Sequence, residues 1–229
     1  MRLLGHLVGS GIKRADPQHL TAIAAMPRPT IKKEVRRLLV LDALGYYHEY
    51  IPQFSYLVEP FTDLTSKKSA NVVVSEDEHE RTFIALDRKL CMPPVLALPE
   101  IGRPFVLHTD ASGSTVVAAL GQTQHGKMEQ PIAFASQKLS GSQLGCAIIE
   151  KEAYAIIWAL NRFREIVYGS HITVMFDRNP LQYIRECSTK SAKLLHWSLS
   201  LQEYDVDNKY TKGTQNVVAD YRHMSEVYR

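Results

Sequence analysis

The sequence is poor in cysteine, and its three cysteines show no metal-binding pattern. Cys91, Cys146 and Cys187 are odd in number, far apart and in no Cys-x-x-Cys spacing. Nothing therefore indicates a zinc site, whose ligands come in closely spaced pairs, or a disulfide framework, which needs an even number of cysteines. A reducing compartment is the expectation for such a chain.

Long apolar runs are missing as well. No stretch approaches the roughly 20 apolar residues that span a bilayer, and the start of the chain, Met1 to His6, lacks the long apolar stretch of a signal peptide. We therefore expect an intracellular protein of the cytoplasm or nucleus that has no membrane contact. The formal net charge of +3 over 229 residues permits a polyanionic partner but does not demonstrate one.

What is present falls into two parts, of which the first is predicted to be helical. After a short apolar stretch, Leu4 to Val8, the pair Asp16-Pro17 begins a helix, because proline is favoured at the first helical position. Thr30 is expected to cap a second helix that runs through Leu44. Further helical segments are expected at Phe54 to Leu64 and, after a polar linker, from Ser75 to Leu90.

The second of these helices carries a basic cluster, formed by Lys32, Lys33, Arg36 and Arg37, on the side opposite its apolar stripe. Such a cluster is usually a solvated helix face. The alternative is contact with the phosphates of a nucleic acid, which cationic side chains neutralise.

After Met92-Pro93-Pro94, strands dominate the pattern. We therefore place residues 1–66 in a helical module, 67–93 in a connecting helix and 94–229 in a second domain. The element order of this domain is βββαβααβα, and it begins with a three-stranded antiparallel meander. We expect strands at 105–110, 115–120 and 131–135, a helix at 147–166, a strand at 171–177, helices at 179–186 and 191–201, a strand at 207–211 and a last helix from 217.

Four acidic residues stand at the ends of these strands or on helices expected to pack beside them. Asp110 and Asp177 each end a strand, Glu152 flanks the apolar stripe of the long helix, and Asp220 lies in the first turn of the last helix. Each alone has a structural explanation, as a turn or helix-capping residue or as a charge at a helix N-terminus. Four converging carboxylates would repel one another without cations, so the set together predicts a metal site.

The donor atoms indicate which metal this site would hold. Carboxylates without Cys or His companions favour Mg²⁺ or Mn²⁺ over zinc, because these hard ions prefer oxygen. Two such ions would activate a water molecule and stabilise the leaving oxygen during cleavage of a phosphodiester. In this hypothesis Asp110 bridges the two ions, Glu152 and Asp177 complete one site, and Asp220 helps to hold the other.

At this point the sequence resembles a known family. The motifs Thr109-Asp110-Ala111-Ser112, Glu150-Lys151-Glu152, Phe176-Asp177 and Asn216-Val217-Val218-Ala219-Asp220 resemble the ribonuclease H domain of gypsy-type LTR retrotransposon polyproteins. This resemblance extends from about Pro94 to the last residue. Upstream, Gly5-His6-Leu7-Val8, Asp16-Pro17, Pro27-Arg28-Pro29-Thr30 and Gly45-Tyr46-Tyr47 through Ser55 resemble the end of the palm, the thumb and the connection of the same family's reverse transcriptase.

The resemblance implies an α/β protein with a ribonuclease H-like fold, a mixed five-stranded sheet flanked by helices, preceded by a small helical thumb and connection module. It implies endonucleolytic hydrolysis of the RNA strand of an RNA/DNA hybrid, with the hybrid and the missing polymerase portion of a polyprotein as partners. Two Mg²⁺ ions, which Mn²⁺ can replace, would be held by Asp110, Glu152, Asp177 and Asp220. Hybrid contacts would come from Lys32, Lys33, Arg36, Arg37, Ser112, Arg178 and Tyr210.

The sequence departs from the family at several positions. It has no Tyr-x-Asp-Asp or similar polymerase motif, so this chain alone is not expected to polymerise DNA. Thr115 and Val117 replace glycines that are usual after the first acid, and Arg178 replaces a histidine after the third. Tyr210 has an equally good explanation as an ordinary strand aromatic. The alternative function is a catalytically silent retroelement remnant that binds nucleic acid or protein.

Overall fold

The computed structural model describes residues 1–39, 47–66, 77–91, 95–124, 128–176, 180–187 and 191–210. Its central feature is a five-stranded sheet in the order β7-β6-β5-β8-β9. The first three strands form an antiparallel meander, and β8 and β9 add to it in parallel. The strands are β5 (Phe105–Ala111), β6 (Thr115–Thr123), β7 (Glu129–Lys138), β8 (His171–Phe176) and β9 (Asp205–Tyr210).

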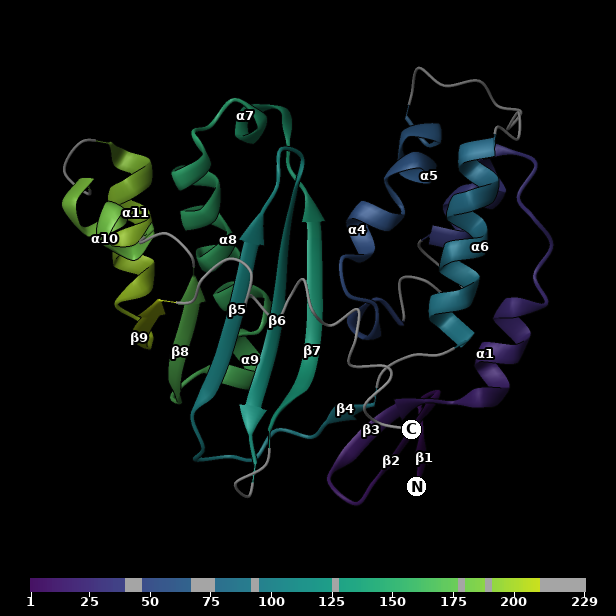
Figure 1. Cartoon of the computed structure of the whole chain (residues 1–229), viewed down its shortest axis with the longest axis horizontal. Helices are drawn as coiled ribbons and strands as arrows, with labels where there is room; N and C mark the ends of the chain where they lie inside the picture. Colours follow the sequence, from purple (N-terminus) through teal and green to yellow (C-terminus); the bar gives the residue numbers. More distant parts are fainter. Residues whose placement is uncertain are drawn as a thin grey trace.

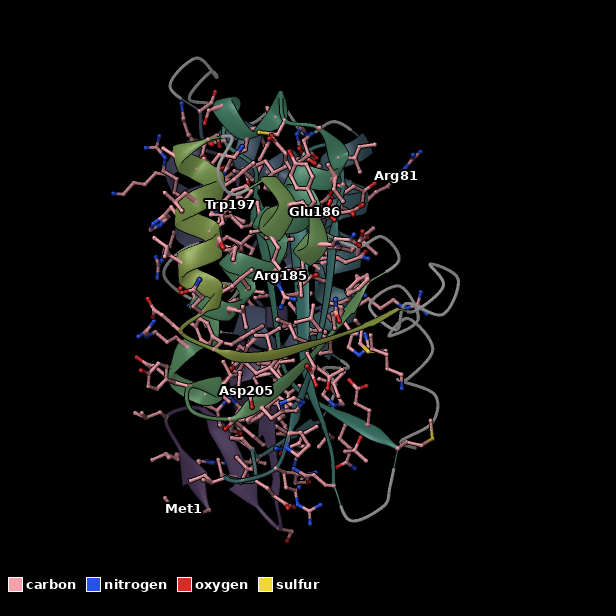
Figure 2. All side chains as sticks on the ribbon, turned by 90° about the vertical axis from the view of Figure 1, so that its left-hand side faces the viewer. Met1, Arg81, Arg185, Glu186, Trp197 and Asp205 are labelled. Atoms are coloured by element: carbon pink, nitrogen blue, oxygen red, sulfur yellow. The ribbon has the colours of Figure 1, made fainter. Side chains whose placement is uncertain are left out.

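Helices cover one face of this sheet (Figure 1). They are α8 (Ile148–Arg162), α9 (Arg164–Val167), α10 (Pro180–Cys187) and α11 (Ala192–Leu201), while the short α7 (Gly141–Leu144) lies beyond the ends of the strands and buries no residue. The apolar stripe of α8, including the fully buried Ile156, packs on Leu107 and Leu120 of the sheet. Figure 2 looks onto the outer side, where α11 with Trp197 lies beside α10 and β9 starts at Asp205.

The predicted mixed five-stranded sheet flanked by helices is therefore confirmed, with most boundaries within a few residues. The long helix expected at 147–166 is interrupted at Phe163, which caps α8 and begins the short α9. The last helix, expected from residue 217, lies outside the described residues. Among the described helices, none is long and apolar enough to cross a membrane.

The N-terminal module contains helices and also a small sheet that the sequence analysis missed. A four-stranded sheet has the order β1-β2-β3-β4, formed by β1 (Arg2–Leu3), β2 (His6–Gly9), β3 (Ile12–Ala15) and β4 (Leu96–Ala97). The turn between β2 and β3 has Ser10 and Gly11 at φ values of 52° and 75°. Two positive φ values in a two-residue hairpin turn match the twist of the flanking strands, so the chain folds back here.

Residues 40–44 of the second predicted helix and the Ser75 start of the last one lie outside the described residues, and the predicted segment 54–64 is divided into two helices. Helices are present at each of the predicted places. They are α1 (Pro17–Ala24), α2 (Lys32–Arg37), η2 (His48–Tyr50), α4 (Phe54–Leu57), α5 (Glu59–Leu64) and α6 (Asp77–Cys91). Asp16 caps α1 as expected, with its carboxylate accepting from Gln18 N at 3.1 Å. The predicted Thr30 cap is wrong by one position, because Ile31 is the N-cap and Thr30 instead donates to the Glu34 carboxylate.

The module packs on the face of β6 and β7 that lies opposite α8 (Figure 1). Val117, Ala119 and Phe134 of the sheet share one buried cluster with Tyr50 and Phe61 of the module. Because β6 is covered on both faces, nearly all of its residues are buried and its sequence lacks strand alternation.

Polar contacts join the same two surfaces. Ser55 N donates to Ser136 Oγ at 2.7 Å, and Lys138 Nζ lies 2.7 Å from Asp63 Oδ1 and 3.2 Å from Glu59 Oε1. The module and the larger sheet are thus held together by apolar packing and by charge pairs.

Candidate functional site

Asp110 lies near the end of β5, and its side chain is exposed. Its Oδ1 atom accepts a hydrogen bond from Ala111 N at 2.8 Å, and its strand neighbour is Val117. Ala111 packs toward α8 in a cluster with Ala155. Since successive strand side chains point to opposite faces, Asp110 projects from the face opposite α8, at the exposed end of the strand.

The turn that follows Asp110 is organised by one hydroxyl group. Ser112 Oγ accepts from Ser114 N at 3.3 Å and from Thr115 N at 3.0 Å, and it donates to Thr115 O at 3.1 Å. The nucleic-acid contact expected of Ser112 stays a prediction. What the structure shows is that this hydroxyl fixes the backbone between β5 and β6.

Glu152, on the second turn of α8, is half-buried, and its Oε2 atom is shielded from solvent. The preceding residue, Lys151, is 9% exposed and donates from Nζ to Gly113 O at 2.9 Å. This contact ties the N-terminal half of α8 to the turn after Asp110. The elements that carry Asp110 and Glu152 are therefore linked directly.

Glu150 faces in a different direction from Glu152. Its carboxylate lies 3.1 Å from Lys193 Nζ on α11 and 3.3 Å from the Tyr183 hydroxyl on α10. Burial acts to raise the pKa of Glu150, but hydrogen bonds from Lys193, Cys146 and Tyr183 outweigh it, so the pKa lies below its ordinary value. Glu150 thus anchors α8 to the outer helices, which leaves Glu152 as the candidate ligand on this helix.

Three predicted site residues, Asp177, Arg178 and Asp220, lie outside the described residues. β8 runs parallel to β5, with Met175 paired to His108, and its last residue is Phe176. The backbone of Tyr210 ends β9 opposite Phe176.

The described residues alone hold no group of three His, Cys, Asp or Glu side chains suited to a metal ion. Asp110 and Glu152 offer oxygen donors only, one exposed and one half-buried. That donor set fits Mg²⁺, which keeps several waters and takes one or two carboxylates from the protein. The convergence of four acids remains a prediction.

The basic cluster of α2 is partly engaged within the module. Lys32 Nζ donates to Ser66 O, and Arg36 donates to Thr65 O at 2.9 Å. Both carbonyls follow the last turn of α5. At a helix C-terminus, cations donate hydrogen bonds to the backbone carbonyls that lack a partner within the helix, and they interact favourably with the negative end of the helix dipole. Lys33 and Arg37 are exposed. The predicted phosphate contact is untested, but two of the four cations have a structural function.

Sequence reasoning did not single out Lys151. A signal was present, because Lys151 precedes Ala155 and Ala159 at four-residue steps on α8, and both alanines are fully buried. A helix stripe that contains small residues allows close approach to a neighbouring element. A lysine on such a stripe is directed toward that element rather than to solvent.

Comparison with known sequences identifies relatives of this chain. The ribonuclease H-like domain family found in reverse transcriptase matches residues 100–204. Pol polyproteins of Drosophila melanogaster transposons are similar over most of the chain: that of opus is 36% identical over 96% of this chain, and that of gypsy 29% identical over 95%. These findings confirm the resemblance to retrotransposon polyproteins. The chain spans about a fifth of the length of these relatives, 23% and 21% respectively.

Solved structures give a likeness in fold. The foamy viral protease-reverse transcriptase in complex with RNA/DNA hybrid superposes with a TM-score of 0.73 over 91% of this chain and 29% of that one, at 20% identity. The same protein in complex with dsDNA gives a TM-score of 0.73 over 92% of this chain and 46% of that one. The similarity covers both the N-terminal module and the five-stranded sheet.

Proposed function

We propose that this chain, whose residues 100–204 match the ribonuclease H-like domain family found in reverse transcriptase, is the ribonuclease H part of a retrotransposon polyprotein that cuts the RNA strand of RNA/DNA hybrids. The observation that carries the proposal is the direct link, Lys151 Nζ to Gly113 O at 2.9 Å, between the strand end with Asp110 and the helix with Glu152. It supports two carboxylates acting at one edge of the sheet.

The proposed roles follow from the placement of each residue. Asp110 would hold metal from the exposed end of β5, and Glu152 would hold it from α8. Because β5 and β8 are parallel neighbours, both lead to the same edge of the sheet. Asp177, which follows β8, and Asp220 would complete the ligand set. Two bound Mg²⁺ ions would supply an activated water and stabilise the leaving oxygen.

The proposed substrate is an RNA/DNA hybrid. The similar foamy viral enzyme was solved with such a hybrid, and the similar Pol polyproteins are several times longer than this chain. We infer that a polymerase portion, supplied by the rest of a polyprotein, is a partner. The exposed Lys33 and Arg37 of α2 are candidates for phosphate contact from the module side.

The test is cleavage of a labelled RNA/DNA hybrid by the purified chain in Mg²⁺ and in Mn²⁺. The Asp110→Asn and Glu152→Gln variants serve as controls, and double-stranded RNA and DNA serve as decoys. The proposal requires cleavage of the hybrid alone, abolished in both variants while their unfolding midpoints stay close to that of the unchanged chain. Cleavage that survives in Asp110→Asn would remove the proposed site.

The alternative, a silent remnant that binds nucleic acid or protein, is favoured by one observation. Thr115 and Val117, which stand where the family resemblance implies glycine, are both buried in the packed structure. The same experiment separates the two functions, since a remnant binds the hybrid without cutting it. Binding without cleavage in both metals, by a folded protein, would favour the remnant.

A further inference from the structure

Lys151 is the one buried lysine among those that the structure describes. Its side chain is 9% exposed, and its Nζ atom donates to Gly113 O at 2.9 Å. Burying an ammonium group costs free energy unless it is hydrogen-bonded or paired. The hydrogen bond to Gly113 O offsets part of this cost, so we ask what that contact does for the structure.

The acceptor of this contact belongs to a short and highly ordered turn. Gly113 lies between Ser112, whose hydroxyl binds the backbone of Ser114 and Thr115, and Ser114, whose carbonyl accepts from Leu139 N at 2.7 Å. The turn is thus bonded to itself and to the end of β7. Lys151 supplies its connection to α8.

We propose that Lys151 is a positioning residue that holds the turn after Asp110 against the helix that carries Glu152. Gly113 follows Asp110 by three residues, and Glu152 is covalently next to Lys151. The hydrogen bond therefore joins the two elements that carry these carboxylates. This inference rests on the proposed function, because it assigns the contact to the metal-binding pair.

The inference makes a prediction opposite in sign to that of simple electrostatics. A nearby ammonium repels a bound cation, so its removal would strengthen metal binding if charge alone mattered. If Lys151 instead sets the carboxylate geometry, its removal weakens metal binding. Residues that orient metal ligands without touching the metal typically alter affinity by about 10- to 100-fold when they are replaced.

The variants are Lys151→Met, which keeps the apolar stem and loses the donor, and Lys151→Arg, which keeps both charge and donor. A buried ion replaced by an apolar residue of similar volume is often tolerated. Lys193→Met is the matched control, because Lys193 also binds α8, through Glu150 at 3.1 Å, and its other hydrogen bond goes to Cys146 Sγ.

Two readouts are taken on the full chain without substrate. The first is calorimetric titration with Mn²⁺, and the second is hydrogen exchange of the Ser114 and Thr115 amides, which donate to Ser112 Oγ. We expect Lys151→Met to weaken Mn²⁺ binding about tenfold or more and to raise the exchange of both amides. We expect Lys151→Arg to restore part of both effects and Lys193→Met to change neither.

Unchanged or stronger Mn²⁺ binding in Lys151→Met would overturn the inference, and so would equal effects in Lys151→Met and Lys193→Met. If Lys151→Met does not fold, the same two measurements compare Lys151→Arg with the unchanged chain. The inference is then overturned if the Ser114 and Thr115 amides of the unchanged chain exchange no more slowly than the amides of the surrounding loops. Failure of the proposed function is a separate result, because it appears as absence of hybrid cleavage by the unchanged chain.

Discussion

The carboxylate of Glu129, on β7, crosses β6 to reach the buried imidazole of His108 on β5, with Oε1 2.9 Å from Nε2. The crossing takes place above Gly121, where an added Cβ would lie 2.2 Å from Glu129 Oε1. The absence of a side chain at Gly121 is therefore what allows β5 and β7, the two neighbours of β6, to be joined by a polar contact.

Gly121→Ala should destabilise the fold by about 1–3 kcal/mol, because the displaced carboxylate leaves His108 buried without its partner. The measurement is the urea midpoint at neutral pH. Gly145→Ala is the control, since an added Cβ there meets nothing within 4 Å. In the Glu129→Ala background, Gly121→Ala should lower the free energy of unfolding by less. An equal loss in both backgrounds would show that the Glu129 crossing is not the reason for glycine at position 121.

Lys138 gives a prediction for alkaline pH. A hydrogen bond to Asp63, together with one to Glu59, raises the pKa of Lys138 above its ordinary value of 10.5. A raised folded-state pKa means that the stabilisation is fully present below the unfolded pKa and is lost as the pH rises through the folded one. Lys138→Met should therefore lower the free energy of unfolding by about 0.2–1 kcal/mol near neutral pH.

The difference between Lys138→Met and the unchanged chain should narrow as the pH rises beyond 10.5. Urea unfolding of both proteins at matched pH measures it, since the other titrating groups contribute equally to each. A difference that stays constant into strongly alkaline solution would mean that the ion pairs with Asp63 and Glu59 do not account for the effect.

Val117 stands where the family resemblance implies glycine, and replacing it tests what the valine contributes to stability. Its side chain is 7% exposed and packs in the cluster shared by β6 and the N-terminal module. Replacing it with the usual glycine should cost about 2–4 kcal/mol, from lost apolar burial and from the added backbone freedom of glycine. The urea midpoint is the measurement, and the exposed Val95→Ala change, expected to be nearly neutral, is the control for side-chain loss.

The basic cluster of α2 should divide into two kinds of residue. Lys33→Gln should reduce the salt dependence of hybrid binding by a slope of about 1 if Lys33 meets a phosphate. Arg36→Met should mainly lower stability, because Arg36 satisfies Thr65 O at the end of α5. Fluorescence binding at several salt concentrations and urea unfolding separate the two effects, and an unaltered salt slope in Lys33→Gln would exclude that contact.

The fold could be predicted from the sequence where local pattern and tertiary packing agree. The five strands of the main sheet follow from apolar segments bounded by polar turns, and Asp16-Pro17 correctly predicts the start of α1. The strand β4 was missed because Leu96–Ala97 has no pattern of its own, and it is a strand only through pairing with Ile12 and Lys13.

In the candidate site, too, some features follow from the local sequence pattern and others depend on tertiary contacts. The positions of Asp110 and Glu152, on a strand end and on a helix face, could be predicted. The contacts of Lys151 and Ser112 could not, because both depend on a turn whose backbone conformation brings Gly113 O to α8. Contacts between a side chain and a distant carbonyl leave no periodic signal in a sequence.

The cluster that joins Val117, Ala119 and Phe134 to Tyr50 and Phe61 also bears on how such polyproteins evolve. If two retrotransposons exchanged a ribonuclease H domain, that domain would place its own β6 and β7 face against the N-terminal module of the other retrotransposon. The apolar side chains of the two surfaces would then no longer match, and the interface would contain voids or steric overlaps. We therefore expect recombination between divergent elements to preserve the module and the sheet together, with productive breakpoints upstream of both.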